Sequence, residues 1–333
     1  MLIKYVNLQL NHFCPKDCFY CYLSKDSRSD SRSRFYKWEL LKTWLQDAPL
    51  DDDVYINLVT GELTYFPELI IQAVKEIRKI ERVKAVKFHF SAVTNGDNPD
   101  VFLGMIKDGY LDTDSLILSF DKAGTPDTMS HCNVQAVEML APYVTVSTAI
   151  HTDSIAAIDE TLDLMAKANV KSWEYYYLMN YKPYEDQDFL DKFKDCLKKI
   201  CDFDKKNPSK VYNIEAYKNS IGKTIDKKQL WCSYGDDSVY ITSDGLIIPC
   251  GAYAADSNYQ TEESKSFLAK APTLEDDSTN SISLCAAARE KTCRHTCDFT
   301  NCNVSQCAEC GMASSGNHCA IRKVETDVFK EEI

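Results

Sequence analysis

The sequence predicts an α/β fold in which a partial (β/α)6 TIM-like barrel is followed by a small cysteine-rich C-terminal domain. Over about residues 1–205, short apolar runs typical of strands alternate with longer amphipathic runs typical of helices. This alternation indicates a parallel sheet with helices on its outer face. Near residue 220 the alternation stops, and short strands with closely spaced cysteines are expected. We therefore place the two domains at 1–215 and 216–333.

Each element rests on its own local pattern. Strands are expected where apolar residues alternate with polar ones or form short runs, at 3–11, 54–61, 84–96, 115–121, 144–151 and 172–180. Helices are expected at 35–46, 67–80, 99–109, 133–143, 154–170 and 188–203. The serine-rich run 24–34 is expected to be a mobile loop.

The carboxyl ends of barrel strands carry the residues that form a site. Six residues lie at such ends in this chain: Cys14, Gly61, Asn95, Asp121, His151 and Asn180. We expect these ends to meet on one side of the sheet.

Composition excludes several classes of protein. The net charge of −12 over 333 residues argues against a nucleic-acid partner. The sequence holds no apolar run long enough to cross a membrane, so no membrane association is expected. The N-terminus lacks the layout of a signal peptide. A cytoplasmic protein with reduced thiols is expected.

The chain has 15 cysteines, and most of them fall into two groups. Cys14, Cys18 and Cys21 form the first group, with the spacing C-x3-C-x2-C directly after a strand. Clustered cysteines in a chain of this kind indicate metal sites. Three thiolates on a four-iron cluster leave one iron open for a small ligand, whereas a zinc ion would need a fourth ligand from elsewhere.

This loop, with Tyr20 before its last cysteine, resembles that of the radical S-adenosylmethionine (SAM) superfamily. The resemblance implies a [4Fe-4S] cluster on Cys14, Cys18 and Cys21 whose open iron binds SAM. It also implies cleavage of SAM to a 5′-deoxyadenosyl radical inside a partial barrel.

The resemblance extends to residues expected to contact SAM. The run VTGEL at 59–63 is similar to the family segment that receives the SAM amino group, and it retains Gly61 and Glu62. Thr60 and Leu63 depart from that pattern. Further expected contacts with SAM are Tyr20, Asn95, Ser119 and Ser147.

The second group of cysteines resembles the SPASM domain, an extension that carries auxiliary [4Fe-4S] clusters. Its opening is similar at Cys232, a hairpin turn at Asp244-Gly245, and Cys250. The later spacing departs from the family pattern, so one or two auxiliary clusters are expected, Cys285 is a spare or a substitute, and a zinc site stays open. The expected ligands are Cys232, Cys250, Cys293, Cys297, Cys302, Cys307, Cys310 and Cys319.

The resemblance implies an enzyme that modifies a peptide or protein, by a crosslink, a thioether, epimerisation or oxidation. Expected catalytic residues are Glu174 and Tyr176 on the tyrosine-rich strand, and Asp121 at a strand end. A small metabolite is the alternative substrate. A zinc or iron–sulfur binding protein without catalysis is the alternative from another class.

The expected partners follow from this chemistry. An external one-electron reductant such as flavodoxin or ferredoxin is needed to start the reaction. Because the chain begins at the first strand, no leader-peptide-binding domain is expected before it. A peptide substrate would bind the barrel mouth, the auxiliary domain or a separate leader-peptide-recognition protein.

Overall fold

The computed structural model describes most of the chain. The described residues are 2–21, 23–31, 34–59, 61–113, 115–121, 133–178, 181–221, 237–254, 262–292 and 317–333.

One eight-stranded sheet runs through the described residues, in the order β6-β5-β4-β3-β2-β1-β7-β8. All neighbouring pairs are parallel except the last, the β7–β8 hairpin. The strands are β1 Ile3–Gln9, β2 Leu50–Val59, β3 Lys87–Thr94, β4 Ile117–Ser119, β5 Thr145–Ile150, β6 Ser172–Tyr177, β7 Ser238–Ile241 and β8 Ile247–Ile248. The predicted order of six barrel strands is confirmed.

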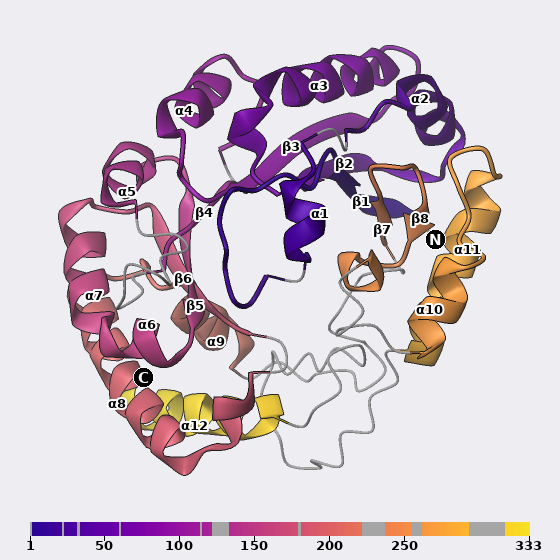
Figure 1. Cartoon of the computed structure of the whole chain (residues 1–333). Coiled ribbons are helices and arrows are strands. Elements are labelled where there is room, and N and C mark those ends of the chain that lie inside the picture. The colour runs from indigo at the N-terminus through magenta and orange to yellow at the C-terminus, as the bar shows by residue number, and fades with distance from the viewer. Residues whose placement is uncertain are drawn as a thin grey trace.

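The helices of the barrel follow one another around the outside of the curved sheet (Figure 1). They are α2 Trp38–Asp47, α3 Pro67–Glu81, α4 Pro99–Lys107, α5 Val134–Leu140, α6 Thr152–Ala156, α7 Ile158–Lys167 and α8 Gln187–Lys206. Helix α9 Tyr212–Ser220 lies inside this ring and contacts β6 (Figure 1). Proline in the first turn of α3 and of α4 suits these helix starts, because proline fixes φ and lacks an N–H that would stay unpaired there. The predicted partial barrel is confirmed.

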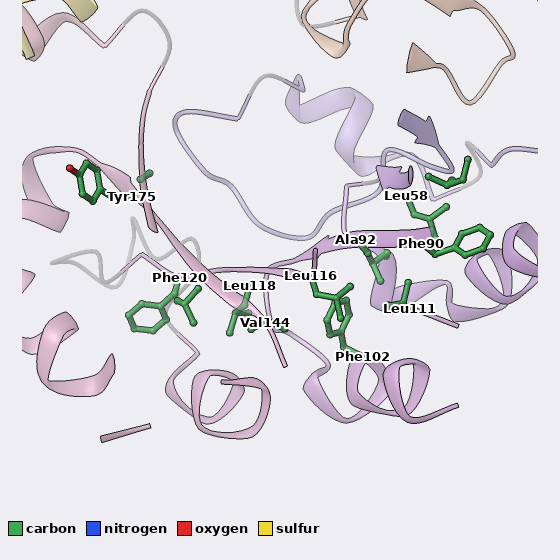
Figure 2. Close-up of a cluster of buried hydrophobic side chains, with 14 of the residues drawn as sticks. Leu58, Phe90, Ala92, Phe102, Leu111, Leu116, Leu118, Phe120, Val144 and Tyr175 are labelled. Atoms are coloured by element: carbon green, nitrogen blue, oxygen red, sulfur yellow. The ribbon is translucent and has the colours of Figure 1, made fainter. Parts of the chain in front are cut away.

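The core lies between the sheet and these helices. Figure 2 shows part of it: Phe90 and Ala92 of β3 and Leu118 of β4 lie together with Phe102 of α4. Each of these side chains is at most 1% exposed. Burial of a Phe or Leu side chain stabilises the fold by about 1.5–3 kcal/mol, so this layer holds the strands in their curve.

On the opposite face of the sheet, polar and aromatic residues of β1, β2 and β3 meet in rows across the strands. The first row is aromatic, because Tyr5 stacks on Tyr55 and Tyr55 stacks on His89. In the next row, two residues further along β1 and β2, Asn57 Nδ2 donates to Asn7 Oδ1 at 2.9 Å. Strand alternation places these residues two apart on one face, so the inside of the barrel is lined by groups that can form hydrogen bonds.

Three sequence predictions differ from the structure. The run 24–34 contains a short helix, α1 Lys25–Ser29, with a Ser24 cap, so the prediction of a loop throughout is wrong. The predicted helix 154–170 is divided into α6 and α7 at Ala157. Beyond residue 220, the described residues hold mainly helices in addition to the predicted hairpin: α10 Glu262–Leu268, α11 Ser278–Thr292 and α12 Asn317–Glu332.

The described parts of the expected second domain pack on the barrel. Strand β7 is hydrogen-bonded to β1, so the hairpin extends the barrel sheet (Figure 1). Gly245 in its turn has φ +87°, a conformation that favours glycine. The expected boundary at 215/216 stays a prediction.

The C-terminal helix α12 lies against α8 and the outer face of β6 (Figure 1). Tyr175 donates its hydroxyl hydrogen to Glu325 Oε1 at 2.6 Å, and Arg322 Nη1 donates to Glu325 Oε2 at 2.9 Å. The Arg322 guanidinium also lies over the ring of Tyr177, 4.2 Å from its centroid. This buried network fixes the strand whose inner face carries Glu174 and Tyr176.

No helix among the described residues is both long and apolar enough to cross a bilayer.

Replacing Glu325 with alanine should destabilise the protein by about 1–3 kcal/mol, because it leaves a buried phenol and a partly buried guanidinium without their acceptor. The free energy of unfolding in denaturant measures the effect. The matched control is Asp327→Ala on the exposed face of the same helix, for which a change within about 0.5 kcal/mol is expected. Equal effects of the two variants would contradict the network.

Candidate active site

The three N-terminal cysteines lie in the loop that follows β1. The backbone N–H of Cys21 donates to the carbonyl of Cys18 at 3.1 Å, and the N–H of Cys14 donates to the carbonyl of Arg28 at 3.0 Å. Cys18 is buried, and the other two cysteines are partly buried. The thiols are close enough to influence one another electrostatically.

Burial raises the pKa of Cys14 to about 11 and the pKa of Cys18 to about 12. Burial also raises the pKa of Cys21. The charges of the neighbouring thiols add to the rise for Cys14 and Cys18. The free cysteines are therefore thiols at neutral pH, and a metal must displace their protons to bind.

The donor set fits an iron–sulfur cluster. Three thiolates from one short loop can hold three irons of a four-iron cluster and leave the fourth without a protein ligand. Across the described residues, no group of three or more His, Cys, Asp or Glu side chains is arranged so that it could hold a metal ion.

The cysteine loop packs directly on the end of β2. A Cβ atom on Gly61 would lie 2.1 Å from the carbonyl oxygen of His12 and 2.3 Å from that of Phe13. The next residue, Glu62, donates its backbone N–H to the carbonyl of Phe13 at 2.7 Å. Only glycine permits this approach, which explains why Gly61 matters even without any contact to a ligand.

The Glu62 side chain joins the ends of β2 and β3. Its Oε1 accepts hydrogen bonds from the N–H of Thr64 (3.1 Å), the hydroxyl of Thr64 (2.7 Å) and the hydroxyl of Thr94 (2.9 Å). Its Oε2 accepts one from the N–H of Asn95 at 2.6 Å and keeps capacity for another. Burial raises the pKa of this carboxyl, whereas these bonds lower it. The contact of Glu62 with an ammonium group stays a prediction.

Asn95 lies between β3 and the cysteine loop. Its Nδ2 lies 3.7 Å from the Sγ of Cys14, and its Oδ1 accepts from the N–H of Asp97 at 2.8 Å. Asp97 also pairs with Lys16 of the cysteine loop, at 2.7 Å. The structure therefore brings together Cys14, Glu62 and Asn95, which the sequence predicted separately.

Tyr20 joins the cysteine loop to the other half of the barrel. Its hydroxyl donates to Asp121 Oδ2, and the N–H of Ala149 donates to Asp121 Oδ1 at 2.7 Å. Asp121 is 1% exposed, and burial raises its pKa to about 6. Burial and the charge of Asp121 raise the pKa of Tyr176, while a hydrogen bond with Tyr20 lowers it in part. Tyr20, Asp121 and Tyr176 thus form one polar group.

Deeper in the barrel, Ser119, Ser147 and Glu174 lie in one row, because the register pairs Ser119 with Ser147 and Ser147 with Glu174. Burial raises the pKa of Glu174, whereas a hydrogen bond with Ser147 lowers it. Glu174 and Tyr176 are two residues apart on β6, so both face the inside. Thr148 faces the other way and accepts a hydrogen bond from the indole of Trp173 at 3.1 Å.

His151 is a site residue to which the sequence assigned no role beyond its position at a strand end. Its ring lies against Phe19 and Tyr20 of the cysteine loop, with centroids 5.4 and 6.2 Å apart. It is 2% exposed, and its Nε2 has no hydrogen-bond partner within the described part of the chain. Burial lowers its pKa. Ser147 and Ala149 are alternate residues of β5 that face the inside of the barrel, and His151 is the next residue in that series. This alternation is the sequence signal that identifies His151.

Few of the expected auxiliary ligands fall in the described residues. Cys250 follows β8, and Cys285 of α11 is buried beneath that strand with its Sγ 3.7 Å from the carbonyl oxygen of Ile247. The side chains of the remaining expected ligands lie outside the described residues: Cys232, Cys293, Cys297, Cys302, Cys307, Cys310 and Cys319.

The comparisons agree with this geometry. Residues 8–193 match the family model described as the radical SAM superfamily. The chain belongs to the radical SAM superfamily. It is therefore a radical SAM enzyme, and membership implies a [4Fe-4S] cluster and SAM as its cofactors. A search of curated proteins found no match to this radical SAM enzyme.

Solved structures share its fold at low identity. Native anSMEcpe with bound AdoMet is 12% identical with a TM-score of 0.59, and the match covers 98% of each chain. Native anSMEcpe with bound AdoMet and Kp18Cys peptide is 13% identical with a TM-score of 0.56, over 84% of this chain and 80% of that one. Streptococcus suis SuiB bound to S-adenosylmethionine is 14% identical with a TM-score of 0.57, over 94% and 69%.

Replacing Gly61 with alanine in this radical SAM enzyme should displace the cysteine loop, because the new methyl group meets two backbone carbonyls. Iron bound per chain after anaerobic reconstitution should fall at least about threefold, and the melting temperature should fall as well.

The matched control is Gly104→Ala in α4, where a Cβ atom meets nothing within 4 Å. Alanine there should leave the iron content unchanged and stabilise the helix by up to about 1 kcal/mol. If Gly61→Ala bound as much iron as Gly104→Ala, the close approach would not matter for the site.

Proposed function

We propose that this enzyme cleaves SAM reductively and abstracts hydrogen from a peptide or protein substrate. The observation that carries the proposal is the contact between Tyr20 of the cysteine loop and Asp121 at the end of β4. This contact supports a cluster site close to the inward-facing Glu174 and Tyr176 of β6. A peptide substrate is supported by anSMEcpe, which has been solved with a bound peptide.

The cofactor residues divide into three sets. Cys14, Cys18 and Cys21 hold the cluster, and the edge formed by Gly61, Glu62 and Asn95 receives SAM on the β2–β3 side. When bound, the cluster and SAM supply a 5′-deoxyadenosyl radical, which takes a hydrogen atom from the substrate. Tyr20, Ser119 and Ser147 complete the cofactor wall on the β4–β5 side.

The barrel residues orient the substrate and handle its proton. Asp121 is buried and Glu174 is partly buried, and burial raises the pKa of each carboxyl above its usual value. With a pKa of about 6, Asp121 can exchange a proton close to neutral pH. Tyr176 is about one-third exposed, so its ring is accessible to a substrate at the mouth. His151 adds an Nε2 that has no hydrogen-bond partner among the described residues and can bond to a bound molecule.

The C-terminal region is proposed to hold one or two auxiliary [4Fe-4S] clusters, with Cys250 as one ligand. Net oxidation of a substrate leaves one electron after hydrogen abstraction, and such a cluster accepts it. Flavodoxin or ferredoxin is the proposed external reductant.

Replacing Cys14, Cys18 and Cys21 together with alanine should abolish SAM cleavage, because the cluster loses its only proposed ligands. Release of 5′-deoxyadenosine under anaerobic reduction measures cleavage. Cys196→Ala/Cys201→Ala, which removes two thiols in the hydrophobic contacts of α8, is the control for thiol content. Cleavage by the triple variant at the control's rate would refute the assignment.

Glu174→Gln and Tyr176→Phe should separate cleavage from substrate chemistry. Each should retain 5′-deoxyadenosine release within about threefold, while product formation falls by about 10²-fold or more if the side chain transfers a proton. Mass spectrometry of short peptides encoded beside the gene measures the product. Tyr212→Phe, on a residue that is 55% exposed in α9, is the control. Full product formation by both variants would remove them from the catalytic set.

A further inference from the structure

Arg28 is a buried cation next to the cysteine loop. It lies in α1, the short helix directly after the three cysteines, and its side chain is only 8% exposed. Arginine is rarely buried unless its donors are satisfied. The feature therefore requires a structural reason.

The guanidinium contacts both halves of the cysteine loop. Its Nη1 donates to the carbonyl of Lys16, which lies between Cys14 and Cys18. Its Nε donates to the carbonyl of Leu23, beyond Cys21, at 3.2 Å. The backbone carbonyl of Arg28 accepts from the N–H of Cys14 at 3.0 Å. One residue thus bridges the segments before and after Cys18.

The charge of Arg28 is only partly balanced by a partner. Its Nη2 pairs with Asp17 Oδ1 at 3.0 Å, but the Asp17 side chain is 65% exposed and is also shared with Lys25. Solvent screens an exposed carboxylate strongly. The positive charge of Arg28 therefore acts on Cys18 and Cys21. At Cys18 it offsets in part the negative charges of the neighbouring thiolates and of Asp121.

We propose that Arg28 is a positioning residue whose guanidinium closes the cysteine loop around the cluster and whose charge raises the reduction potential of that cluster. The inference rests on the proposed cluster site. Reduction adds one negative charge to a group that already carries three thiolates. A buried cation nearby stabilises the reduced state more than the oxidised state.

Geometry and charge can be separated by substitution. Lysine keeps the positive charge but lacks the planar fork that reaches two carbonyls at once. Methionine keeps much of the apolar stem and removes both the charge and the donors. Lys25→Met is the matched control, because it also removes one positive charge that contacts Asp17. The Lys25 side chain, however, is 79% exposed.

The experiment uses the full chain, reconstituted anaerobically with iron and sulfide. The probe is the electron paramagnetic resonance signal that changes on addition of SAM, because only a cluster with an open iron responds to that molecule. A redox titration gives the reduced fraction, and loss of iron to a chelator gives the retention of the cluster. Neither readout requires the substrate.

Arg28→Met should lower the ratio of reduced to oxidised cluster at least about tenfold at the wild-type midpoint. Arg28→Lys should keep that ratio within about threefold but lose iron to the chelator several-fold faster. Lys25→Met should match the wild type in both readouts. If Arg28→Met binds no cluster, the iron loss of Arg28→Lys becomes the deciding measurement. Faster loss than in the wild type confirms the positioning role, and a wild-type rate contradicts it.

Wild-type potential and iron retention in both Arg28 variants would overturn the inference while leaving the cluster site intact. A wild-type protein without a SAM-responsive signal would instead overturn the proposed function. The two failures are therefore distinguishable.

Discussion

The backbone contact between the cysteine loop and the end of β2 is the constraint on which the site depends. At Gly61 two chain segments approach so closely that no side chain fits between them. The adjacent N–H of Glu62 then bonds to the loop, and the Glu62 carboxylate accepts bonds from Thr94, the last residue of β3, and from Asn95, which follows it. The loop is thereby positioned by the sheet itself, because backbone atoms allow far less freedom than exposed side chains.

A second contact fixes the loop from the opposite side. Tyr20 reaches Asp121 and lies beside Tyr176, so the β4–β6 half of the barrel takes part in positioning the loop. Strand β6 is in turn held from outside by Glu325 of α12. The inner face that carries Glu174 and Tyr176 is therefore stabilised by the C-terminal end of the chain, which links the barrel to the region proposed to hold auxiliary clusters.

Much of the site was predictable from sequence, but its contacts were not. Cys14, Gly61, Asn95 and Asp121 follow recognisable strand patterns, and the structure places all four near the cysteine loop. Arg28 escaped prediction because it lies in a serine-rich polar run that has the composition of a loop. Its burial comes from carbonyl groups of the cysteine loop that fold back onto it, and the local sequence does not encode that closure.

The sequence by itself determined the order of strands and helices, since hydrophobic periodicity follows the geometry of each element. It also determined the cysteine spacing that indicates a cluster. Only the tertiary structure decided which strand-end residues meet, because contacts across a sheet depend on register and on the curve of the barrel. The row of Ser119, Ser147 and Glu174 arises from that register, and the bonds from Thr94 and Asn95 to Glu62 arise from the neighbouring positions of the ends of β2 and β3.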